Sequence, residues 1–334
     1  MRHQLRRILP VALVCLTAII FSSCQPRGAP SKGESKAGQP STLTGKKLKV
    51  GYSFYSIKIP WVVSYKRAFE NGMKEHLNYE IAWLDGNSDS KAIAAGVEKW
   101  TAQKLDLIVS MSPDHVPLRM TYKKALEAGI PVLLTGEPPD YRVYESMTAF
   151  SGLSAWEAGR MAADLLNQTL GGRGQVACIT GPRGSASEQQ NTEGFKASLQ
   201  RLASKIQIAA TEDGKWDATA SYQRALSILT RFPKIDAIYA SEDAMGSAVI
   251  RALKEKGYTP GQVKVVALGG SRGAVADLKA GWYLGIVNQD PSLCAQQDIW
   301  LITALLEEHR RLPRAAQAPQ EMITKENADQ FAGW

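Results

Sequence analysis

The side chains that most often carry out acid–base or nucleophilic chemistry are few in this chain of 334 residues. Ser-His-Asp or Cys-His catalysis needs a histidine close to the site. Only His115 follows a candidate site loop, and we expect it to face solvent or to cap its turn. No group of His, Cys, Asp and Glu has metal-ligand spacing, so we predict no metal and no cofactor. We therefore predict that the chain is not an enzyme. Its histidines are His3, His76, His115 and His309.

Two glycine-rich turns follow apolar segments that read as strands. These are GPRGS after VACIT and GGS after VVAL. Such a turn can hold an anion at the start of a helix. Neither turn satisfies G-x-x-x-x-G-K-[ST] or G-x-G-x-x-G between a strand and a helix, so neither predicts a nucleotide site.

Aromatic side chains are the stronger candidates for a binding site. Tyr55 ends the first expected strand, and Pro60-Trp61 opens the helix that follows. A tryptophan directly after a proline at a helix start is held rigidly. A flat indole can pack against the C–H face of a sugar ring, while the sugar hydroxyls bind polar partners. The alternative is that Trp61 is a core or interface residue.

The elements that must position these residues alternate regularly from Lys47 onward. Short apolar strands alternate with amphipathic helices, which is typical of parallel sheets covered by helices on both faces. Ligands of such sheets bind beyond the carboxyl ends of the strands. A second strand–helix set starts after residue 150, so we predict an α/β fold with two doubly wound parallel-sheet lobes. The expected strands are LKVGYSF, YEIAWLD, DLIVSMS, IPVLLTG, MTAFSGL, QVACITG, IQIAATE, DAIYASE, VKVVALGG and LGIVNQD.

Five longer segments follow one another in a characteristic order along the chain. They are IPWVVSYKRAFENG, DLIVSMSPDHVPLRMTYKKALEAGIPVLLT, GPRGSASEQQNTEGFKASL, WDATASYQRALSILTRFPKIDAIYASEDAMGSAVIRALKEKG and VKVVALGGSRGAVADLKAGWYLGIVNQDP. In this order they resemble the type I periplasmic solute-binding proteins, the ribose- and galactose-binding family. The resemblance covers about residues 47–327, and the tail MITKEN is similar to the final strand of the family.

The resemblance implies two lobes joined by a multi-strand hinge, with a ligand held between them. The N-terminal lobe would comprise residues 47–150 plus 290–317, and the C-terminal lobe residues 151–289 plus 318–334. The hinge crossings would lie near 150–152, 288–290 and 317–322.

The same resemblance suggests ligand contacts. Trp61 matches the stacking residue of the family, and Trp216 stands at a second aromatic position. Asp217 beside it is expected to cap a helix. Gln289 matches a position that hydrogen-bonds ligand hydroxyls, although a buried amide there could equally serve backbone groups only.

The chain departs from the family pattern where members that bind simple sugars usually carry a charged clamp. Gly136-Glu137 replaces Asp plus Arg after the fourth strand, Asn191 replaces an Arg, and Glu242 replaces an Asn. Gly269-Gly270 replaces an Asp and leaves volume free. Two carboxylates in one cleft repel unless a cationic or donor-rich ligand lies between them. The alternative is that both glutamates point to solvent. The expected ligand contacts are Tyr55, Trp61, Glu137, Asn191, Trp216, Glu242 and Gln289.

The first 24 residues predict export. A basic start (MRHQLRR) precedes an uncharged run over residues 8–21, which is shorter than a membrane span. Ser22-Ser23 leads to Cys24, and this ending resembles the lipobox of bacterial lipoproteins, with Phe21 where Leu is preferred. We predict a signal peptide over residues 1–23 and lipidation of Cys24. The alternative is ordinary cleavage with Cys24 as an incidental thiol.

Residues 24–46 are rich in Pro, Gly, Ser and Lys, which is typical of a flexible linker. The whole chain has a net charge of +8, and loss of the three signal-peptide arginines lowers it to +5. The excess is spread out and forms no basic stripe with aromatics, so no nucleic-acid partner is predicted. Cys178 and Cys294 sit among core-type residues; buried separate thiols are expected, and a disulfide stays the alternative.

These features predict an extracytoplasmic, lipid-anchored, monomeric binding protein. It would capture a carbohydrate-like solute and deliver it to the membrane permease and ATPase of an ABC importer. The alternative is a sensing subunit of the same fold that signals to a membrane histidine kinase or a chemoreceptor. A sugar-responsive DNA-binding regulator is excluded, because a signal peptide occupies the place of its helix-turn-helix.

Overall fold

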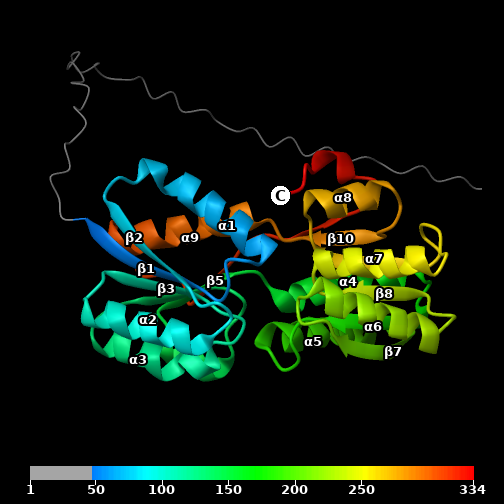
Figure 1. The fold of residues 1–334 in the computed structure, drawn as a ribbon, viewed down its shortest axis with the longest axis horizontal. Helices are drawn as coiled ribbons and strands as arrows, with labels where there is room; N and C mark the ends of the chain where they lie inside the picture. The colour runs from blue at the N-terminus through cyan, green and yellow to red at the C-terminus, as the bar shows by residue number, and fades with distance from the viewer. Residues whose placement is uncertain (1–46) are drawn as a thin grey trace, which may run out of the picture. The chain divides into compact units, whose positions relative to one another are not determined.

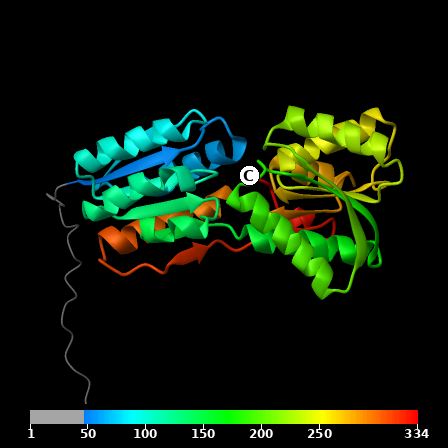
Figure 2. The same ribbon diagram turned by 90° about the horizontal axis from the view of Figure 1, so that it is seen from below.

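The computed structural model describes residues 47–334, which form two six-stranded sheets. Both views show the sheets as separate units, each with its own helices (Figures 1 and 2). The expected alternation of strands and helices is present throughout this range, and the predicted fold class is confirmed. The predicted signal peptide over residues 1–23, the linker over residues 24–46 and the lipid on Cys24 lie outside the described residues.

The first sheet has the strand order β11-β5-β4-β3-β1-β2, and its strands are all parallel. Helices α1 and α9 pack on one face, where Tyr65 and Leu301 enter the core, and α2 and α3 pack on the other (Figure 1). The strands are β1 (Leu48–Phe54), β2 (Tyr79–Asp85), β3 (Leu107–Met111), β4 (Val132–Gly136), β5 (Ala149–Gly152) and β11 (Ala315–Gln317). The helices are α1 (Pro60–Gly72), α2 (Ser90–Ala102), α3 (Arg119–Glu127) and α9 (Pro291–Leu306).

The second sheet repeats this arrangement with the order β12-β10-β9-β8-β6-β7. Only β12 runs antiparallel, against β10. Helices α4 and α5 cover one face, and α6, α7 and α8 cover the other. The strands are β6 (Arg173–Thr180), β7 (Lys205–Asp213), β8 (Ala237–Ala240), β9 (Lys264–Gly269), β10 (Gly285–Asn288) and β12 (Glu321–Ile323). The helices are α4 (Ala155–Thr169), α5 (Ala186–Arg201), α6 (Ala218–Arg231), α7 (Asp243–Glu255) and α8 (Arg272–Lys279).

The chain passes between the sheets three times, after β5, after β10 and between β11 and β12. Strand β5 continues to Gly152 in the first sheet, two residues beyond the boundary expected at residue 150. The exact division into lobes stays a prediction. Cys178 and Cys294 are both buried and free, as expected for separate core thiols.

Among residues 47–334, no helix is long and apolar enough to cross a membrane.

Candidate functional site

A cavity of about 280 Å³ is lined by residues from both sheets. In each sheet the strand order reverses next to the first strand, because β1 lies between β2 and β3, and β6 lies between β7 and β8. Loops at such a switch point splay apart beyond the carboxyl ends of the strands and leave a crevice. All seven residues expected from the sequence line this cavity: Tyr55, Trp61, Glu137, Asn191, Trp216, Glu242 and Gln289.

Trp61 is fixed from two directions. Pro60 occupies the first turn of α1, and the Trp61 indole Nε1 donates a hydrogen bond of 2.8 Å to the Gln289 carbonyl. The ring also stacks on Tyr65, with centroids 5.5 Å apart. The indole therefore joins α1 of the first sheet to the crossing segment after β10.

Trp216 is presented by a loop in an unusual backbone conformation. Lys215 and Trp216 both have positive φ values, of 58° and 52°. Such strain in residues other than glycine clusters at functional sites. The indole lies against Gly181, where an added Cβ would come within 2.7 Å of it. The Asp217 carboxylate accepts the Ala220 N–H at 2.7 Å, which confirms its expected role as the cap of α6.

Glu137 follows β4 directly, and its Oε2 is shielded from solvent with no hydrogen-bond partner among the described residues. Burial raises the pKa of Glu137 to about 6, and the Ser187 hydroxyl opposes part of that rise. The alternative that both glutamates point to solvent is wrong for this side chain.

Glu242 has a structural role as well as a place in the cavity. Its Oε2 accepts the Met245 N–H at 3.0 Å, so it caps the first turn of α7. Burial, followed by the charge of Asp243, raises the pKa of Glu242. Ser241 beside it is 6% exposed, and its Oγ has no partner among the described residues.

Asn191 and Gln289 are both held in place by hydrogen bonds to other residues of the protein. Asn191 is buried on α5, where its Oδ1 accepts a long hydrogen bond of 3.5 Å from the Tyr239 hydroxyl. The Gln289 N–H donates to the Gly269 carbonyl at 2.7 Å, and its own carbonyl accepts the Trp61 indole N–H. Both backbone groups of Gln289 are therefore used in hydrogen bonds within the protein, and the residue also lines the cavity.

The expectation that Gly269-Gly270 leaves volume free is wrong. A Cβ on Gly269 would lie 2.5 Å from Cγ of Asp243, and one on Gly270 would lie 2.8 Å from Oδ1 of Asn288. The Asp243 carboxylate accepts the N–H groups of Gly270 at 3.0 Å and Ser271 at 2.7 Å. The glycines therefore permit close approach of these two side chains.

Trp334 is a lining residue that the sequence analysis missed. Its indole Nε1 donates to the Gly269 carbonyl at 3.2 Å, and its backbone N–H donates to the Gly270 carbonyl at 3.3 Å. No strand or helix pattern surrounds it, and Gly333 is the one sequence signal for a tight approach. Met111, Ser187 and Leu268 were likewise not singled out.

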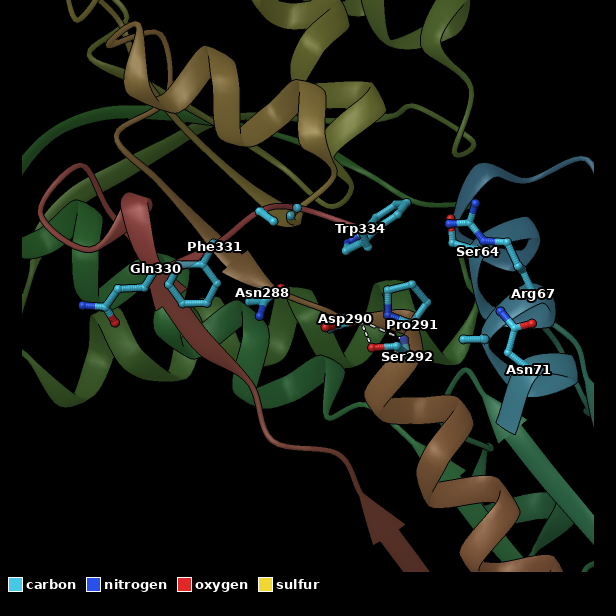
Figure 3. Close-up of a pocket in the computed structure, with 14 residues that line it drawn as sticks. Ser64, Arg67, Asn71, Asn288, Asp290, Pro291, Ser292, Gln330, Phe331 and Trp334 are labelled. Carbon is cyan, nitrogen blue, oxygen red and sulfur yellow. Dashed lines mark hydrogen bonds between the residues drawn. The ribbon is translucent and has the colours of Figure 1, made fainter. Parts of the chain in front are cut away.

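Trp334 also borders a second cavity of about 440 Å³. Figure 3 shows Trp334 facing Ser64 and Arg67 of α1 across this space, with Asp290 and Ser292 near the start of α9. None of the seven expected site residues lines it. Trp334 therefore lies between this space and the cavity described above.

His115 does not face solvent as expected. It is 2% exposed, and its Nδ1 lies 3.2 Å from the Tyr122 hydroxyl. Burial lowers the pKa of His115 to about 3, so the ring is neutral at physiological pH. Among residues 47–334, no group of three His, Cys, Asp or Glu side chains is arranged to hold a metal ion.

Comparison with known proteins decides the family. Residues 50–310 match the family described as periplasmic binding protein domain. The chain belongs to this family. The prediction from the sequence is thereby confirmed, and so is the prediction that the chain is not an enzyme, because the relatives are binding proteins.

This periplasmic binding protein is similar to several characterised relatives. It is 23% identical to the ribose import binding protein of Bacillus subtilis, over 88% of this chain and 90% of that protein. It is 24% identical to the xylitol-binding protein of Mycolicibacterium smegmatis, over 90% and 84% of the two chains. A solute-binding protein of Bacillus halodurans, solved with bound myo-inositol, shares the fold with a TM-score of 0.80 and 21% identity, over 87% and 99% of the chains.

Proposed function

We propose that this periplasmic binding protein captures a sugar or sugar-like polyol in the cavity lined by both sheets and delivers it to an ABC importer. The observation that carries the proposal is that cavity, where indoles and unpartnered acceptors converge from two separate sheets. Aromatic faces and convergent polar groups are the two things a polyhydroxylated ligand needs. The ligand contacts would be Tyr55, Trp61, Glu137, Asn191, Trp216, Glu242 and Gln289.

The relatives support the ligand class. Their names refer to ribose and xylitol, and one related structure holds myo-inositol. These compounds share a small size and many hydroxyl groups. We propose that the importer partner is a permease with its ATPase. This is supported by one relative's name, an import binding protein, and by the related structure, which is that of an ABC transporter solute-binding protein. We also propose that the protein acts as a monomer.

Calorimetry with ribose, D-allose, xylitol and myo-inositol tests the binding role. At least one compound should bind, and Trp61→Ala should weaken that binding sharply without unfolding the protein. Trp300→Ala is the matched control, because Trp300 is 47% exposed on α9 and does not line the cavity. Equal affinities of the Trp61 and Trp300 variants would remove Trp61 from the site.

The lipid anchor is tested separately. If Cys24 is lipidated, the protein partitions into the detergent phase, and Cys24→Ser moves it to the aqueous phase. Aqueous partitioning of the unaltered protein would contradict the anchor and leave the binding role untouched.

A further inference from the structure

Glu137 presents an acceptor that the protein does not use. Its Oε2 is shielded from solvent and has no partner among the described residues. A carboxylate can accept about four hydrogen bonds, and an unpartnered buried acceptor costs free energy. Because the residue lines the cavity, the missing donor must come from there.

The opposite sheet contributes acceptors to the same cavity. Ser241 is more than nine-tenths buried, and its Oγ also lacks a partner among the described residues. Glu242 adjoins it and uses one oxygen to cap α7. Glu137 comes from the first sheet, and Ser241-Glu242 from the second, so both walls offer oxygen atoms.

The charges around these acceptors do not balance. Lys58 is the one basic side chain among the lining residues, and it is exposed. His115, whose ring is buried next to the Glu137 backbone, is neutral. Asp243 adds a further carboxylate behind Glu242 and is held by two backbone N–H groups. Burial and the charge of Asp243 raise the pKa of Glu242 to about 8, so Glu242 is mostly protonated at neutral pH and the negative charge of the lining lies on Glu137. The cavity therefore favours a positive group next to Glu137.

The aromatic walls favour the same charge. Trp61, Trp216, Trp334 and Tyr55 all line the cavity. The face of an indole attracts a cation, most strongly where water is excluded, and it also packs against the C–H face of a sugar. An aminated carbohydrate uses both properties, whereas a neutral one uses only the second.

We propose that the ligand is a carbohydrate or polyol that carries a protonated amine, with its ammonium group bound by the carboxylate of Glu137. This inference rests on the proposed function and narrows it. An ammonium group supplies three donors and a compensating charge. A neutral hydroxyl supplies one donor and leaves the charge of Glu137 uncompensated.

Matched pairs of compounds test the inference in the purified protein. Calorimetry compares glucose with glucosamine and galactose with galactosamine, and includes N-acetylglucosamine as an uncharged amide. At least one amino sugar should bind ten or more times more tightly than its neutral partner and its acetylated form. Glu137→Gln should reduce that ratio at least tenfold. Glu80→Gln, at an exposed position on β2, should leave it unchanged.

Proton release gives a second readout. At pH 6, binding of the amino sugar should release protons from the protein, measured in two buffers of different ionisation enthalpy, and Glu137→Gln should reduce the release. Equal or tighter binding of neutral sugars would overturn this inference while leaving the proposed function in place. Failure of every compound, neutral and aminated, would overturn both.

Discussion

Asp298 is a buried residue that supports the position of Trp61 through Tyr65. Its Oδ2 accepts hydrogen bonds from the Tyr52 hydroxyl at 2.9 Å, from Thr135 Oγ1 at 2.6 Å and from the Tyr65 hydroxyl. Tyr65 in turn stacks on Trp61. One carboxylate on α9 therefore links β1, β4 and α1 behind the cavity.

Removal of that carboxylate should destabilise the protein. Asp298→Ala leaves buried hydroxyls without their acceptor, and we expect a loss of about 3 kcal/mol in the free energy of unfolding. Asp298→Asn should lose less, because its amide oxygen still accepts. Urea denaturation measures both variants. A loss for Asp298→Ala within about 0.5 kcal/mol of zero would show that the hydroxyls find other partners.

Glu137 should make stability depend on pH. Burial raises its pKa from the ordinary value of 4.5 to about 6, so the folded state binds the proton more tightly than the unfolded state. Its contribution to stability is fully present below pH 4.5 and is lost as the pH rises through 6. The loss is about 2 kcal/mol, since one pH unit corresponds to about 1.4 kcal/mol.

Comparison of two variants isolates this effect. Without ligand, Glu137→Gln should be more stable than the unaltered protein by about 2 kcal/mol above pH 7, and the advantage should vanish towards pH 4.5. Glu80→Gln should show no such dependence. Urea denaturation between pH 4.5 and 8 measures both, and a pH-independent difference for Glu137→Gln would contradict the burial of its charge.

At the scale of elements, the segment that follows η4 (Ala328–Gln330) carries Trp334 to the cavity. Gly333 has φ +74°, and an added Cβ would lie 2.6 Å from the backbone of Arg272 at the start of α8. Arg272 also donates its N–H to the Trp334 carbonyl at 3.3 Å. The close approach of this segment to α8 is therefore what places the indole.

Gly333→Ala should displace Trp334 and remove its indole from the lining of the cavity. We expect ligand affinity to fall about tenfold, which corresponds to about 1.4 kcal/mol. Gly273→Ala is the matched control on α8, because a Cβ there meets nothing within 4 Å. Calorimetry and indole fluorescence follow the change. If both variants bind as tightly as the unaltered protein, Trp334 does not contact the ligand.

The limits of prediction from sequence follow from the range of the contacts. The strands were predictable because each is a short apolar run, such as LIVSM in β3, bounded by turns. The seven expected ligand contacts were predictable from the family resemblance, together with the rule that loops after parallel strands share one edge. The position of Trp334 was not predictable, since it depends on α8, which is distant in the sequence. The burial of His115 was not either, although its partner Tyr122 is only seven residues away, because no local pattern shows that α3 packs over the ring.

At the scale of the whole molecule, the two sheets are joined by three crossing segments, and one cavity draws its lining from both. A ligand that contacts residues of both sheets binds more tightly to the closed conformation, in which the two sheets approach each other. It shifts the population from the open to the closed conformation by the difference between its affinities for the two. Trp61 on α1 is hydrogen-bonded to Gln289 in the crossing segment after β10. A ligand bound in the cavity should therefore also change the conformation of this crossing segment.

Hydrogen exchange and X-ray scattering test this coupling. At a ligand concentration 100 times its Kd, the protein should gain about 2.7 kcal/mol of stability. The loops after β1 and after β8 should both gain protection, although they belong to different sheets. The radius of gyration should decrease in the same samples. If protection from hydrogen exchange were confined to one sheet and the radius of gyration were unchanged, the ligand would be bound by residues of one sheet alone. Only a ligand that contacts both sheets can link binding to closure of the cavity.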